Sequence, residues 1–140
     1  MKALVDRRRR IVRVRRVQHL QASAEAARAE GKVASLETSA ERLVELRMSL
    51  GLAPGTVNGA ALSNVGELAM RLDTVRDGLT DAIVSARASA EQFAALRLEA
   101  RIRQESAEKL GEQAQAALVE ERERRVPGGS RRRLRMGEEA

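Results

Sequence analysis

A long segment without proline, residues 63–126, decides the fold. It reads SNVGELAMRLDTVRDGLTDAIVSARASAEQFAALRLEARIRQESAEKLGEQAQAALVEERERRV. Alternating steps of three and four residues from Val65 pass through sixteen positions, of which fourteen are apolar: Val65, Leu68, Leu72, Val75, Leu79, Ala82, Ala86, Ser89, Phe93, Leu96, Ala100, Arg103, Ala107, Leu110, Ala114 and Ala117. An apolar repeat sustained over so many heptads predicts a long coiled-coil helix.

A second apolar seam with the same spacing lies in residues 2–50. Eight of its nine positions are apolar: Ala22, Ala26, Ala29, Val33, Leu36, Ala40, Leu43, Arg47 and Leu50. Continued toward the N-terminus, this register places Arg8, Arg15 and His19 on the seam, while a rotated stripe collects Leu4, Ile11, Val14 and Val17. We therefore expect either a register shift here or a helix end that splays toward a partner.

Helix breakers separate the two segments. Proline and glycine cluster around Pro54 and again around Pro127, and each such cluster ends a helix. The sequence predicts an all-α fold, a long antiparallel two-helix coiled-coil hairpin with a basic open end. Its parts are a helix over 2–50, a loop over 51–62, a helix over 63–126 and a flexible basic tail over 127–140.

Details of this hairpin follow from the same spacing. Ser63 or Asn64 can cap the second helix, and Glu67 stands in capping-box position to Asn64. A loop centred near residue 57 would make residue i face residue 114 − i, so the second helix would extend unpaired beyond about residue 111. Because many seam positions are alanine, each layer buries little area, and we expect the isolated hairpin to be marginally stable.

The composition argues against an enzyme. The 140 residues include one Phe and no Tyr, Trp or Cys, and His19 is the single histidine. Thiol chemistry is thus excluded, and the pattern offers no metal-ligand cluster and no phosphate-binding glycine loop. We expect no cofactor and no small-molecule substrate. No run is apolar enough to span a membrane, and arginines interrupt any secretory signal at the N-terminus.

The net charge of +6 arises at the two ends of the sequence. Residues 1–20 carry +7 and residues 127–140 carry +2, while the segments between are slightly acidic. Three interpretations of the N-terminal arginines remain open. They can be solvated or paired with Glu99, Glu105, Glu108 and Glu112, they can bind an acidic protein, or they can bind nucleic acid. The lack of aromatic side chains to stack on bases disfavours the last of these.

The layout as a whole resembles the flagellar export protein FliJ family. The shared features are the basic start MKALVDRRRR, one fold-back through a Gly/Pro/Asn loop, and the basic tail SRRRLRMGEEA. The resemblance implies a non-enzymatic stalk of the flagellar type III export apparatus, or of a related injectisome, that couples the hexameric export ATPase to the export gate and escorts export chaperones. It also implies a cytoplasmic location, peripheral at the inner face of the bacterial membrane.

The resemblance also implies two binding surfaces. The ATPase ring would be contacted by Arg7, Arg8, Arg9, Arg10, Arg13, Arg15 and Arg16. The cytoplasmic domain of the export gate would be contacted by Leu46, Leu50, Leu68, Leu72 and Val75, where the family pattern includes aromatic residues and this chain has aliphatic ones. Leu46 lies off the predicted seam and is the best candidate for a contact. Two other functions remain open: a basic architectural DNA-binding protein, and a coiled-coil adaptor or dimerisation module.

Overall fold

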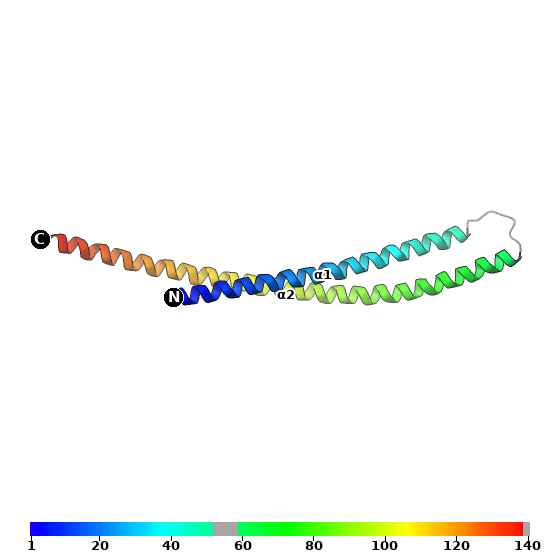
Figure 1. Ribbon diagram of the computed structural model, residues 1–140, viewed down its shortest axis with the longest axis horizontal. Coiled ribbons are helices and arrows are strands. Elements are labelled where there is room, and N and C mark those ends of the chain that lie inside the picture. Colours follow the sequence, from blue (N-terminus) through cyan, green and yellow to red (C-terminus); the bar gives the residue numbers. More distant parts are fainter. Residues whose placement is uncertain (52–58, 139–140) are drawn as a thin grey trace. The chain divides into compact units, whose positions relative to one another are not determined.

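Two long helices make up the described chain (Figure 1). The computed structural model describes the backbone of residues 1–51 and 59–138, and the side chains of these ranges as far as Val126. Helix α1 spans Lys2–Gly51 and helix α2 spans Gly59–Glu138, with no strand in either described range. The predicted all-α helical hairpin is confirmed.

The helices divide into two compact units. Unit 1 combines Met1–Ala22 of α1 with Arg97–Ala140, and unit 2 is Ser23–Leu96. In unit 1, the Arg9 guanidinium donates a hydrogen bond to Gln115 and that of Arg16 donates one to Glu108. In unit 2, Arg87 donates to Glu37 and Arg47 donates to Asp73. Residue numbers thus rise along one helix as they fall along the other, so the helices are antiparallel within each unit.

These cross-helix pairs correct the predicted register. The numbers of the paired residues add up to between 120 and 124, rather than the predicted 114. Met1 of unit 1 is therefore level with about residue 122 of α2. The part of α2 that extends past α1 begins there, and not near residue 111 (Figure 1).

The seam of α1 keeps one register throughout. In unit 2 it is formed by half-buried or buried side chains at the predicted positions, apart from Arg47, which is exposed. In unit 1 the same spacing continues through the buried or half-buried residues Val5, Arg8, Val12, Arg15, His19 and Ala22. No register shift occurs, because Leu4, Val14 and Val17 of the rotated stripe remain exposed and only Ile11 is half-buried. The described start of α1 packs on α2 and is not splayed.

On α2, one of the two predicted seam rows is displaced by one residue, since six of its eight members are exposed and only Ala82 and Ala117 are half-buried. The row containing Leu72, Leu79, Ala86, Phe93, Ala100, Ala107 and Ala114 faces α1 as expected, because all of these are buried or half-buried. The second row is Ala69, Ile83, Ala90, Gln104, Gly111 and Leu118, which are buried or half-buried, together with exposed residues at positions 76 and 97. The predicted members Leu68, Val75, Leu96 and Leu110 lie one residue before that row and are 43–51% exposed.

The helix boundaries also differ from those predicted. Helix α2 begins at Gly59, so Ser63 and Asn64 lie inside it and do not cap it. It continues past Pro127 to Glu138, beyond the predicted end at Val126. A proline removes one backbone hydrogen bond, which weakens a helix without forbidding it. The centre of the predicted loop, residues 52–58, lies outside the described residues.

Candidate partner-binding surfaces

The N-terminal arginines do not form one cluster, because they are distributed around the whole circumference of α1. Arg8 and Arg15 lie on the seam and are half-buried. By register they face Ala114 and Ala107, and these small side chains leave room for the long arginine stems. The Arg15 guanidinium donates a hydrogen bond of 3.0 Å to Gln18 on its own helix.

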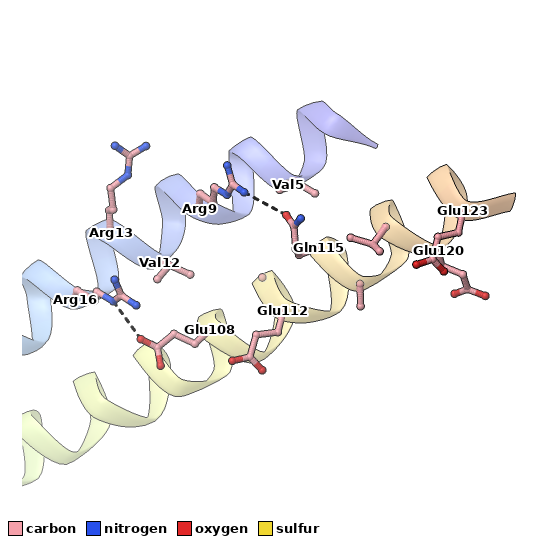
Figure 2. Close-up of a pocket in the computed structure, with 13 residues that line it drawn as sticks. Val5, Arg9, Val12, Arg13, Arg16, Glu108, Glu112, Gln115, Glu120 and Glu123 are labelled. Atoms are coloured by element: carbon pink, nitrogen blue, oxygen red, sulfur yellow. Dashed lines mark hydrogen bonds and ion pairs between the residues drawn. The ribbon is translucent and has the colours of Figure 1, made fainter. Parts of the chain in front are cut away.

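Arg9 and Arg16 point across to α2. Arg9 donates to the amide oxygen of Gln115 at 3.3 Å, and Arg16 donates to the Glu108 carboxylate at 3.2 Å (Figure 2). Of the four glutamates expected to face the arginines, Glu108 alone pairs with α1 in the described chain. Glu105 pairs instead with Arg101, one turn earlier on α2.

The remaining arginines, Arg7, Arg10 and Arg13, are exposed. Within the described ranges they make no hydrogen bond or ion pair, so their guanidinium groups are available to a partner. The structure shows how each arginine is placed within this chain, and leaves binding to an acidic protein or to nucleic acid as a matter for experiment. Two of the arginines are paired across the helices, two lie along the seam, and three are solvated.

An open groove of about 890 Å³ runs between the helices of unit 1 on the side of Arg9 and Arg16. Its apolar floor consists of Val5, Val12, Gly111, Ala116 and Val119. Gly111 has a packing role there: a Cβ at this position would lie 3.6 Å from Cγ2 of Val12, so the two helices approach closely. Sequence reasoning missed this groove because Gly111 was not placed on the seam.

The two rims of the groove carry opposite charges. The α1 rim bears Arg9, Arg13 and Arg16, and the α2 rim bears Glu108, Glu112, Glu120 and Glu123. Two hydrogen bonds, from Gln104 at 3.0 Å and from Arg16, hold the pKa of Glu108 below its ordinary value, because they favour the ionised carboxylate. Arg13 projects away from α2 and Glu112 away from α1 (Figure 2), and neither is paired within the described residues.

The five residues predicted to contact the export gate all lie in unit 2. Leu46 is 54% exposed, and Leu68 and Val75 are 46% and 51% exposed. Leu50 and Leu72 are half-buried seam residues that face each other by register. By the same register Leu46 lies beside Val75, so Leu46, Val75 and Leu68 form one exposed aliphatic strip along the seam. The other two residues belong to the packing between the helices.

The described residues contain no group of three or more acidic, histidine or cysteine side chains that could hold a metal ion. Over the same residues, neither helix has a segment apolar enough to cross a membrane. The known proteins add no further constraint: no family model matches the chain, and neither a curated protein nor a solved structure matches it significantly.

Proposed function

We propose that this chain is a coiled-coil coupling component of a flagellar-type protein export apparatus, a stalk that joins the export ATPase to the export gate. The observation that carries the proposal is an antiparallel hairpin of unequal helices, 50 and 80 residues long, with two chemically different exposed surfaces that lie in different units. Unit 1 presents solvated arginines, and unit 2 presents an aliphatic strip.

The arginine surface is proposed to contact the hexameric flagellar export ATPase. Arg7 and Arg10 support this assignment because they are exposed and unpaired among the described residues, so that binding would not have to break an internal ion pair. Guanidinium groups bind carboxylates in a bidentate manner, which suits an acidic protein surface. Nucleotide chemistry would reside in the ATPase, and this chain would supply no catalytic residue.

The aliphatic strip is proposed to contact the cytoplasmic domain of the export gate protein, and export chaperones would bind the hairpin as further partners. Leu46 is the most informative residue because more than half of it is exposed. Such a side chain contributes little to the hairpin and can be buried by a partner at about 25 cal/mol per Å² of apolar area. This role places the protein in the cytoplasm, peripheral to the inner face of the cell membrane.

The ATPase contact is tested by capture of the purified export ATPase on the immobilised chain. Arg7→Glu/Arg10→Glu should lose capture, and Arg28→Glu/Arg42→Glu, which makes the same charge change on exposed arginines of unit 2, should retain it. Equal loss in both pairs would show that only net charge matters. Failure of the unaltered chain to capture the ATPase, together with salt-sensitive binding of duplex DNA, would support the architectural DNA-binding alternative.

The gate contact is tested independently with Leu46→Ala. This variant should bind the gate domain more weakly while the helical circular dichroism is unchanged. Ala24→Ser, a small change at an exposed position of the same helix, serves as the control. A loss of helicity in Leu46→Ala would show instead that Leu46 is a structural residue.

A further inference from the structure

We propose that the groove of unit 1 is an interface for a second copy of this chain, which packs groove to groove to form a four-helix bundle. The groove belongs to one unit, is lined by both helices and has an apolar floor. This inference rests on the chemistry of the groove and does not depend on the proposed export function.

The floor has apolar area left to bury. Val5 is already covered, but Val119 is 42% exposed. The seam below the groove is thin because α2 contributes Gly111 and several alanines there, so the two helices alone enclose little apolar volume. A second layer of helices would cover this floor in the way that four-helix bundles cover theirs.

The opposite charges of the two rims indicate that the partner bound in the groove is a second copy of this chain. A homodimeric interface is self-complementary, since each patch must match the same patch on the other copy. Rotation by 180° about an axis parallel to the helices places α1 of one copy beside α2 of the other. The arginine rim of each copy then lies along the glutamate rim of its partner.

The register of unit 1 brings the unpaired charges to the same level. The pairs Arg9–Gln115 and Arg16–Glu108 show that Arg13 is level with about residue 111 of α2. Glu112 therefore lies within one residue of the level of Arg13. The two-fold axis preserves that level, so Arg13 of each copy meets Glu112 of the other. Each dimer gains two such pairs, and both side chains already project outward from their own hairpin (Figure 2).

The test is sedimentation velocity of the 140-residue chain over a range of concentrations, with interference optics because the chain has no Trp or Tyr. We expect a reversible dimer. Arg13→Glu and Glu112→Arg should each weaken dimerisation by about tenfold or more, because each sets two like-charge pairs across the interface. An equimolar mixture of the two variants should form dimers again, since the glutamate introduced in one copy then faces the arginine introduced in the other.

Two further variants separate this interface from general effects of charge and packing. Arg10→Glu and Glu99→Arg make the same charge changes on exposed residues of unit 1 outside the groove, and their dimers should match the unaltered chain. Val119→Gln should weaken the dimer without reducing helicity. The proposal is overturned if the unaltered chain stays monomeric, if both rim variants dimerise normally, or if their mixture fails to dimerise.

Discussion

The two units share one heptad register but differ in what fills it. In unit 2 the seam consists mainly of aliphatic side chains and Phe93, with Leu36, Leu43, Leu72 and Leu79 at its centre. In unit 1 the corresponding positions include Arg8, Arg15, His19, Gln104 and Gly111 beside apolar residues such as Val5 and Val12. The period of a sequence therefore specifies which faces meet, while the side chains at those faces decide how strongly they are held. Unit 2 therefore has the more apolar seam, and unit 1 has the more polar one.

The largest expected effect comes from a charge placed in the unit 2 seam. Ala26 is 1% exposed, the most buried residue of the described chain. Ala26→Asp should lower the free energy of unfolding by about 3 kcal/mol or more, because the carboxylate loses hydration and gains no partner. Urea denaturation followed by circular dichroism measures this.

The neighbouring residue supplies the control for that substitution. Ala27 is exposed, so Ala27→Asp should cost only the difference in helix propensity, about 0.5 kcal/mol. If Ala26→Asp and Ala27→Asp lower the free energy of unfolding equally, then Ala26 is not buried between the helices of unit 2.

Truncation of one seam residue in each unit compares their packing directly. Leu43→Ala in unit 2 should cost about 2 kcal/mol, the low end for leucine because Leu43 is half-buried. Val12→Ala in unit 1 should cost about 1 kcal/mol, since Val12 faces a glycine. Hydrogen exchange should show that each loss affects amides of its own unit. A larger loss of stability in Val12→Ala than in Leu43→Ala would show that unit 1 is the more tightly packed unit.

The sequence predicted the fold and, from Ala22 onward, the register of α1, because apolar residues there recur at one phase. Toward the N-terminus it wrongly predicted a register shift or a splayed end, because Arg8, Arg15 and His19 occupy seam positions where apolar residues are expected. It failed on half of the α2 seam for a physical reason. Two neighbouring rows of α2 compete for the second seam position. One of them is more hydrophobic because it contains Leu68, Val75, Leu96 and Leu110, so a count of apolar residues favours it. The row that contacts α1 is instead the one with Ala69 and Gly111, because small side chains allow the helices to approach closely.

The exposure of the candidate surface residues was also predictable only in part. The sequence correctly marked Leu46 as lying off the seam, where it is exposed in unit 2. It could not separate Arg9 and Arg16 from Arg7 and Arg10, because the predicted register differed by nearly ten residues from the observed one. Pairing across the helices depends on that register and thus on where the chain reverses, which periodicity alone does not specify.

Replacing Gly111 of unit 1 by alanine should make the two units more alike. Gly111→Ala should raise the free energy of unfolding by about 1 kcal/mol, because alanine favours helix and its Cβ makes an ordinary contact with Val12. Gly78→Ala on α2 is the matched control, since no atom lies within 4 Å of its added Cβ. Gly78→Ala should gain stability from helix propensity alone. A loss of stability in Gly111→Ala would indicate that the helices of unit 1 are too close to accept even one added methyl group.

The smallest expected effect is electrostatic and concerns Glu108. Hydrogen bonds from Gln104 and Arg16 lower its pKa from the ordinary 4.5. A carboxyl group whose pKa is lower in the folded state stabilises the fold above its unfolded pKa, and that contribution is lost as the pH falls through the folded value. Between about pH 5 and about pH 3 the unaltered chain should therefore lose more stability than Glu108→Gln, which cannot ionise.

Comparison with a second variant separates the effect of this carboxyl group from that of removing any one exposed negative charge. Glu99→Gln removes an exposed carboxylate that has no hydrogen bond within the described residues, and its pH profile should follow that of the unaltered chain. If Glu108→Gln also follows it, the ion pair between Arg16 and Glu108 contributes nothing measurable to stability. In unit 1, α1 would then be held on α2 by the packing of its seam, including Val5 and Val12, and by the hydrogen bond from Arg9 to Gln115.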